Sequence, residues 1–328
     1  NFFKSIVVTG TNGKSTTCKI LSHILTKSKY HPILGGNIGT PILNLKIKKD
    51  SLLIIEASSF QLAHSKFIKP DYGILLNISN DHLDWHGTMK NYINSKFKIF
   101  EKQEKKQFSF VSKNLKLEFK KRKLPGTLVS PNLNSYKKFK NKIENPYLKS
   151  NINDENMSYI FELSKFLGVK RTLFLKSLNS FKGLPHRYEI FLKNKNCVFI
   201  NDSKATTFQA SKYALKNTRD IYWILGGLPK RNDKINLKNL KKNIVKVYLV
   251  GKNISFFKKQ ISKEVSFFVA KNLRNSVIQI IKDIKIFKRT NNTILLSPAS
   301  ASFDQFPNFE KRGDEFKKLS KFYAKKYI

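Results

Sequence analysis

A glycine-rich segment near the beginning of the chain combines residue types that could bind phosphate groups. It consists of Gly10, Thr11, Asn12, Gly13, Lys14, Ser15 and Thr16. An apolar run precedes it and a helical pattern follows it, so its backbone amides and the amino end of the helix would face an anion. The lysine would neutralise charge, and the serine hydroxyl could reach Mg²⁺. The strict phosphate-loop motif has glycine where Val8 stands. The sequence therefore predicts a variant phosphate loop, and an ordinary strand-to-helix turn remains the alternative.

Groups that could bind a metal ion follow other apolar runs in the first half. Glu56 follows the run at 51–55, and His82 follows the run at 72–78. Because the carboxyl ends of parallel strands meet at one sheet edge, we expect these side chains to gather around the phosphate loop with the hydroxyls of Ser15 and Ser58. A histidine in a loop is more often a surface or capping residue, and this alternative stays open for His82.

The elements that position these residues follow from the alternation of short apolar runs with helical patterns. This alternation predicts an α/β protein, with a parallel-sheet domain containing the phosphate loop and then a smaller, Rossmann-like doubly wound domain. The segment at 182–185 breaks the helical pattern, and a hairpin with its turn at 194–196 follows. We therefore expect domains at 1–183 and 184–328. Strands are expected at 5–8, 51–55, 72–78, 221–225, 245–250, 265–269 and 293–296.

The composition fits two packed domains and sets limits on partners. The 328 residues are 40% hydrophobic, yet they carry a net charge of +41. Such a charge is the usual sign of nucleic-acid binding, but the lysines are spread along the whole chain rather than gathered in one patch. We therefore expect no nucleic-acid partner. A basic, non-catalytic nucleic-acid-binding or scaffold protein remains the alternative from another functional class.

The remaining composition points to the cytoplasm. The sequence has no run of about 20 apolar residues, which a membrane span needs. Cys18 and Cys197 lie far apart and show no metal-ligand spacing, so we expect reduced structural thiols. These features predict a soluble, cytoplasmic protein without a membrane partner, and we expect a monomer.

Further segments, in the same order and over nearly the whole chain, resemble the ATP-dependent Mur ligases, whose phosphate loop has the form found at 10–16. The segments lie at 35–41, 56–62, 77–84, 183–187, 201–206 and 297–310. Those containing Ser59-Phe60-Gln61 and Asp304-Gln305-Phe306 are similar to the members that add D-glutamate. The resemblance implies an ATP- and Mg²⁺-dependent amide ligase of peptidoglycan synthesis, which joins D-glutamate to UDP-N-acetylmuramoyl-L-alanine through an acyl phosphate.

The resemblance also implies roles for single residues. The catalytic residues would be Lys14, Glu56, His82 and Lys96, and Mg²⁺ would be held by Ser15, Glu56, His82 and Lys96, with Lys96 carbamylated. Residues 10–16 would bind ATP together with Asn153, Asn156, Arg187 and Asp202. Substrates would be bound by Asn37, Ser58, Lys204, Thr206, Lys230, Ser302, Phe303 and Phe309. Taken singly, Lys96 fits a solvated helix lysine, Lys204 and Lys230 fit surface charges, and Asn153 or Asp154 fits a helix N-cap.

Two departures from the family pattern leave alternatives open. The adenine-binding motif Gly-x-His-Asn-x-x-Asn is present at 150–156 with both asparagines but with Ser150 and Ile152 in place of glycine and histidine. Family members also carry a uridine-binding domain before the phosphate loop, so we expect this chain to correspond to the central and C-terminal domains. A chain that opens with the phosphate loop also fits folylpolyglutamate synthase, although Lys14-Ser15-Thr16 and the segment at 304–306 favour the Mur ligases.

Overall fold

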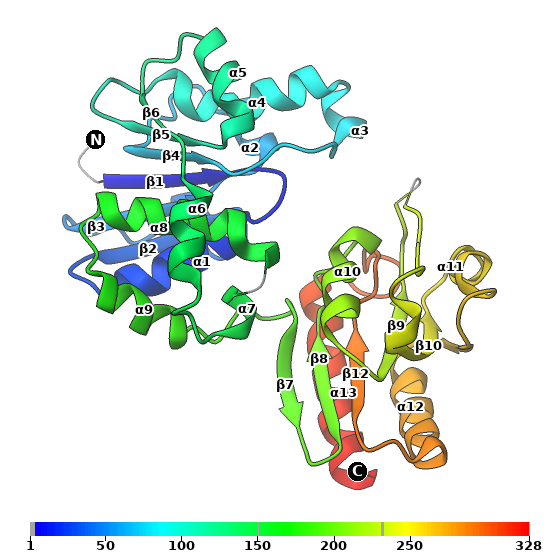
Figure 1. Cartoon of the computed structure of the whole chain (residues 1–328). Coiled ribbons are helices and arrows are strands. Elements are labelled where there is room, and N and C mark those ends of the chain that lie inside the picture. The colour runs from blue at the N-terminus through cyan, green and yellow to red at the C-terminus, as the bar shows by residue number, and fades with distance from the viewer. Residues whose placement is uncertain (1–3, 150, 231–232, 328) are drawn as a thin grey trace. The chain divides into compact units, whose positions relative to one another are not determined.

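The computed structural model describes residues 4–149, 151–230 and 233–327, and the chain divides into two compact units at 1–182 and 183–328 (Figure 1). Each unit has its own sheet and its own hydrophobic core. In the described part of the chain, no helix is long and apolar enough to cross a membrane.

The first unit is built on a parallel sheet, with six strands in the described residues, in the order β2-β3-β1-β4-β5-β6. Its strands are β1 (Lys4–Thr9), β2 (His31–Gly36), β3 (Ser51–Glu56), β4 (Tyr72–Leu75), β5 (Phe108–Val111) and β6 (Thr127–Val129). The strands expected at 5–8 and 51–55 are confirmed. The expected strand at 72–78 is wrong at its end, because the chain leaves the sheet after Leu75 so that Asn77 can accept a bond from the phosphate loop.

Helices cover both faces of this sheet, with α1, α8 and α9 on one side and α2, α4 and α5 on the other (Figure 1). Helix α1 forms because Ile20, Leu21, Ile24 and Leu25 repeat at helical spacing and are fully buried. The helices are α1 (Lys14–Thr26), α2 (Ser59–His64), α3 (Leu83–His86), α4 (Met89–Glu101), α5 (Lys116–Lys121), α6 (Leu133–Lys140), α7 (Pro146–Lys149), α8 (Asp154–Phe166) and α9 (Arg171–Asn179). Short 3₁₀ turns lie at η1 (Ile42–Asn44), η2 (Lys113–Leu115) and η3 (Asn151–Asn153).

The second unit has a mixed sheet, with six strands in the described residues, in the order β11-β10-β9-β12-β8-β7. Only the edge pair β7 and β8 is antiparallel among these strands, and the two form the hairpin expected around 194–196. The strands are β7 (Glu189–Lys193), β8 (Cys197–Asn201), β9 (Ile221–Gly226), β10 (Ile244–Val250), β11 (Phe267–Lys271) and β12 (Asn292–Leu296). The strand expected at 265–269 begins two residues later, since the Val265 amide still bonds to Ile261 in the turn that follows a helix.

The helices of this unit pack against two separate apolar clusters. One cluster joins the sheet to α12 and α13, and the other joins it to α10 and α11. These elements are α10 (Phe208–Asn217), α11 (Ile254–Ile261), α12 (Leu273–Phe287), α13 (Phe309–Tyr327) and the 3₁₀ turn η4 (Lys241–Asn243). The sheet therefore has helices on both faces, and the loops after β8, β9 and β12 meet at its carboxyl edge.

Candidate active site

The phosphate loop connects the carboxyl end of β1 to the first turn of α1. Gly10 and Gly13 have φ values of 150° and 85°, which a side chain would strain. A Cβ at Gly13 would also lie 2.1 Å from Oδ1 of Asn156, so the loop packs directly on α8. The first amides of α1 have no acceptor within the helix, and no acidic residue lies in its first turn. The loop is thus shaped to bind an anion.

Asn77, which directly follows the buried segment after β4, fixes this loop from the neighbouring strand. Its carbonyl oxygen accepts from the Thr11 amide at 2.9 Å, and its Oδ1 accepts from the Asn12 amide at 2.9 Å. Thr11 is also hydrogen-bonded through Oγ1 to the hydroxyl of Tyr92 on α4, at 2.9 Å. Asn77 was not among the predicted site residues, although a polar residue after a buried strand is a signal for a position at the sheet edge.

Two lysine amines meet at the loop. Lys14 donates to the carbonyl oxygens of Gly10 and Thr11 at 2.8 and 2.9 Å, and Lys96 donates to Gly10 at 2.9 Å. Lys96 lies on α4 and is only 1% exposed, so the alternative of a solvated helix lysine is wrong. Burial, followed by the charge of Lys14, lowers the pKa of Lys96 to about 7, while Asp81 acts in the opposite direction.

Glu56 ends β3 and presents a buried carboxylate next to β1. Its Oε1 accepts from Nδ2 of Asn37 at 2.8 Å, which brings two predicted site residues together. Its Oε2 is buried and has no hydrogen-bond partner among the described residues. A buried carboxylate oxygen without a donor suits a cation ligand, so this position fits the predicted Mg²⁺.

His82 lies at the start of α3 with a φ of 54°. It occupies the N-cap position, but its side chain makes no capping hydrogen bond. The ring packs edge-on against Phe60, and Nε2 lies 3.4 Å from Oδ2 of Asp81. In the described part of the chain, no three His, Cys, Asp or Glu side chains form a metal cluster. The predicted metal set contains only two residues of these types, and whether its members meet around one ion stays a prediction.

Two other predicted residues of the first unit, Ser58 and Asn153, have local structural partners. Ser58 caps α2 in a reciprocal capping box with Gln61. Asn153 precedes α8 at the N-cap position, but its side chain donates to the Tyr147 carbonyl at 2.7 Å rather than capping the helix. The capping alternative is therefore wrong for the Asn153 side chain. Ser150, where the family glycine is replaced, lies outside the described residues.

In the second unit, Asp202 directly follows β8 and is buried. Its Oδ2 accepts from the Ser297 hydroxyl at 2.7 Å, and its Oδ1 accepts from the Tyr188 amide at 3.0 Å. Burial raises the pKa of Asp202 to about 7, although both hydrogen bonds and the charge of Arg187 act against this rise. Asp202 thus joins the loops after β8 and β12 at one edge of the sheet.

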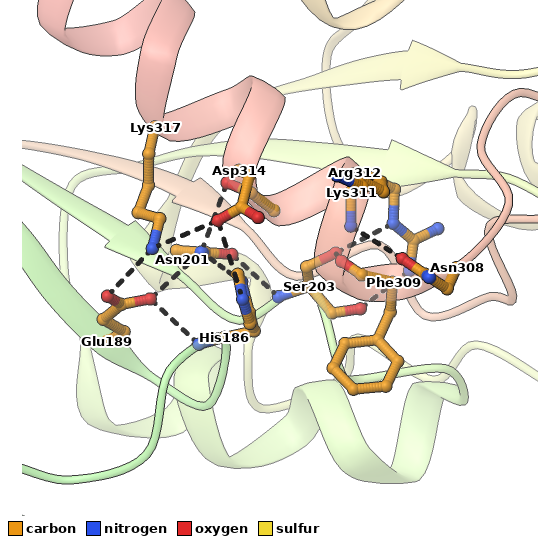
Figure 2. Close-up of polar contacts among 11 residues, drawn as sticks. His186, Glu189, Asn201, Ser203, Asn308, Phe309, Lys311, Arg312, Asp314 and Lys317 are labelled. Atoms are coloured by element: carbon orange, nitrogen blue, oxygen red, sulfur yellow. Dashed lines mark hydrogen bonds and ion pairs between the residues drawn. The ribbon is translucent and has the colours of Figure 1, made fainter. Parts of the chain in front are cut away.

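Lys204 and Phe309, two predicted substrate residues, are brought together. The half-buried amine of Lys204 lies 4.6 Å from the Phe309 ring centre, a cation–π contact. Ser302 is buried, whereas Phe303 is 70% exposed and Lys230 is exposed in the loop after β9. Arg312 on α13, which was not among the predicted site residues, donates to Ser203 in the loop after β8 (Figure 2). Nothing in the sequence distinguishes a buried arginine on a helix from an exposed one.

These features define an α/β protein with a phosphate loop and a second, doubly wound unit. A family model described as the Mur ligase middle domain matches residues 8–153. The UDP-N-acetylmuramoylalanine–D-glutamate ligase of Rickettsia felis is 35% identical over 336 residues, covering 96% of this chain and 75% of that protein. The enzyme of the same name from Nitrobacter winogradskyi is 33% identical over 343 residues, which cover 96% of this chain and 73% of that protein. The chain belongs to the Mur ligase family.

Solved structures agree in fold. MurF ligase from Thermotoga maritima, solved in complex with ADP, has a TM-score of 0.69 at 16% identity and covers 99% of this chain and 81% of that one. Escherichia coli FolC, also solved in complex with ADP, has a TM-score of 0.63 at 12% identity, and the match covers 98% of this chain and 90% of that one. The predicted fold class and the predicted family resemblance are both confirmed.

Proposed function

We propose that this protein uses ATP to join D-glutamate to UDP-N-acetylmuramoyl-L-alanine in peptidoglycan synthesis. The observation that carries the proposal is the 35% identity, over 96% of the chain, to a relative named for this reaction. The phosphate loop and the two lysine amines beside it support the ATP-dependent part. Folylpolyglutamate synthase, the alternative considered from the sequence, is disfavoured because relatives at this level of identity carry the D-glutamate ligase name.

The chemistry requires activation, because a carboxylate is a poor electrophile. The muramoyl-alanine carboxylate takes the γ-phosphoryl group of ATP, so a carboxylate–phosphorus bond forms and ADP leaves. The amine of D-glutamate then attacks the acyl carbon, inorganic phosphate leaves, and the amine loses a proton as the amide forms. Lys14 stabilises the negative charge on the transferring phosphoryl group, a largely electrostatic task.

The residues at the sheet edge fit a magnesium ion. Glu56 would bind it through the buried Oε2 that has no partner among the described residues, together with Ser15, His82 and a modified Lys96. When bound, the ion would neutralise the charge of the phosphates. The hydroxyl and carboxylate oxygens of this set are the ligand types that Mg²⁺ prefers, and a carbamate on Lys96 would add another anionic oxygen.

A carbamate on Lys96 would supply that oxygen. Carbon dioxide reacts with the uncharged amine, and the lowered pKa of about 7 makes this form available near neutral pH. The reaction forms a nitrogen–carbon bond, releases one proton from the amine nitrogen and leaves an anionic oxygen ligand. The modification would therefore turn a buried cation, which repels Mg²⁺, into a group that binds it.

The other substrates would bind at the remaining predicted residues, with the phosphates of ATP on the unit at 1–182 and the amino acid on the unit at 183–328. Ammonium and hydroxyl groups are the donors that the two carboxylates of D-glutamate require. These donors would be Lys204, Thr206, Lys230 and Ser302, beside the rings of Phe303 and Phe309. Arg187, Asp202, Asn153 and Asn156 would contact the nucleotide, while Asn37 and Ser58 would contact the muramoyl substrate.

An assay of ADP release separates this proposal from its alternatives. The protein should release ADP only when ATP, UDP-N-acetylmuramoyl-L-alanine and D-glutamate are all present. Release that depends instead on a folate and L-glutamate would favour folylpolyglutamate synthase. Salt-sensitive binding to random DNA without any ligase activity would favour the basic nucleic-acid-binding alternative.

A further inference from the structure

Arg312, near the start of α13, is a buried cation whose partners are neutral. Its side chain is 2% exposed. Nε donates to the Ser203 hydroxyl at 3.0 Å, and Nη2 donates to the carbonyl oxygens of Ser203 and Ser300 at 2.7 and 2.9 Å. Nη1 is buried without a partner among the described residues. Burial lowers the pKa of Arg312 to about 10, with Asp304 acting against it. Burying a charge in this way is costly, so the position calls for an explanation.

The guanidinium lies where three loops of the second unit meet. Ser203 belongs to the loop after β8, and Ser300 belongs to the loop after β12. A Cβ at Gly227, in the loop after β9, would lie 3.2 Å from Nη1, so this nitrogen faces the third loop. The loops after β9 and β12 also bond to each other through the backbones of Leu228 and Ala301, at 2.9 and 3.0 Å.

Each of these loops carries residues proposed to bind the amino acid. Lys204 follows Ser203 directly, Ser302 follows Ser300 by two positions, and Lys230 follows Gly227 by three. The connection to Lys204 is the most direct. The Ser203 hydroxyl accepts from Arg312 and donates to the Phe309 carbonyl at 2.8 Å (Figure 2). The amine of Lys204 lies 4.6 Å from the centre of the Phe309 ring.

A lysine could not make the same set of bonds. The guanidinium is a rigid plane whose donors point in fixed directions, whereas an ammonium is a single charge on a flexible stem. Nη2 alone bonds to carbonyl oxygens from two loops, while Nε bonds to a hydroxyl on one of them. The bonds to both loops therefore depend on the shape of arginine as well as on its charge.

We propose that Arg312 is a positioning residue for the amino-acid site, because its guanidinium holds in register the loops that carry Lys204, Lys230 and Ser302. The proposal rests on the function proposed above, which gives those three residues their substrate. Arg312 itself is too deeply buried to contact the amino acid. Its loss should displace the binding groups of the second unit and leave the phosphate loop of the first unit intact.

The test is steady-state kinetics of the Arg312→Lys variant, with D-glutamate and ATP varied separately. The apparent KM for D-glutamate should rise about tenfold or more, while the KM for ATP should change by less than about threefold. A matched control is Arg289→Lys, because Arg289 is exposed and pairs with Asp220 at the surface. The control should leave both values unchanged. An equal rise in both KM values, or no rise for D-glutamate, would overturn the proposal.

A second variant covers the case in which Arg312→Lys does not fold. Ser203→Ala keeps the guanidinium but removes its Nε acceptor and the bond to the Phe309 carbonyl, so the KM for D-glutamate should rise by about threefold or more. An unchanged KM in a folded Ser203→Ala variant would contradict the positioning role. If the unmodified protein shows no ADP release that depends on D-glutamate, the proposed function fails. If it is active and neither variant shifts the KM for D-glutamate, only the role of Arg312 fails.

Discussion

Lys14 and Lys96 donate hydrogen bonds to one shared acceptor, the carbonyl oxygen of Gly10, at 2.8 and 2.9 Å. The two amines come from different elements, the phosphate loop and α4. Burial, and next the nearby charge of Lys14, disfavours the charged form of Lys96 and lowers its pKa. This shared contact connects the lysine proposed to bind phosphate with the lysine proposed to become a metal ligand.

Replacing Lys14 should remove the main positive charge of the phosphate loop. The Lys14→Ala variant is expected to lose ADP release by about 100-fold or more, since a positioned charge at the transferring phosphoryl group contributes on this scale. The measurement is the initial rate of ADP release with all substrates saturating. Lys29→Ala, which removes an exposed lysine just after α1, serves as the control and should retain activity. Near-normal turnover in Lys14→Ala would refute the phosphate-binding role.

The carbamate proposal predicts chemical rescue at Lys96. The Lys96→Ala variant should lose activity, and short carboxylic acids such as acetate should restore part of it by supplying an oxygen ligand in the vacated space. The control is Lys90→Ala, an exposed position on the same helix, where activity should persist and acetate should have no effect. Full activity of Lys96→Ala without any acid would exclude the carbamate.

We expect Lys230 to bind D-glutamate rather than the nucleotide. In Lys230→Ala, the apparent KM for D-glutamate should rise about tenfold or more, and the KM for ATP should change little. Lys238→Ala, another exposed lysine after β9, should leave both values unchanged. An equal effect on both KM values would mean that Lys230 binds the nucleotide or stabilises the folded structure instead.

Asp202 should make stability depend on pH. Burial raises its pKa from 3.8 to about 7, so the folded state binds a proton more tightly than the unfolded state between these values. The unfolding free energy should therefore fall as pH rises from about 4 to about 7, because the cost of the buried charge is absent below this window and complete above it. Asp202→Asn should remove a decrease of the order of 4 kcal/mol, measured by urea unfolding across this range. An identical pH dependence in the variant and the unmodified protein would show that Asp202 does not titrate in this window.

The phosphate loop and the strands around it could be predicted because their signals are local. Glycine, lysine and hydroxyl residues between an apolar run and a helical pattern define such a loop, and β1 and β3 appear as continuous apolar runs. The end of β4 could not be predicted in this way. Leu76 and Ile78 are as apolar as strand residues, yet the chain leaves the sheet there because Asn77 between them bonds to the phosphate loop, a contact between segments far apart in sequence.

The burial of single charged residues could not be predicted from the sequence either. Most of the 63 basic residues are solvated, and nothing local distinguishes Lys96 or Arg312 from them. Their burial depends on tertiary neighbours: the Gly10 carbonyl for Lys96, and the loops after β8 and β12 for Arg312. Only the resemblance to the Mur ligases marked Lys96, whereas no motif marked Arg312.

The most direct test of the proposed function is to identify the product. The protein should convert ATP, UDP-N-acetylmuramoyl-L-alanine and D-glutamate into ADP, phosphate and the D-glutamyl amide in equal amounts, with the product detected by mass spectrometry. Omission of any one substrate should abolish product formation. ADP release without the amide product, or an amide formed equally well from L-glutamate, would contradict the assignment.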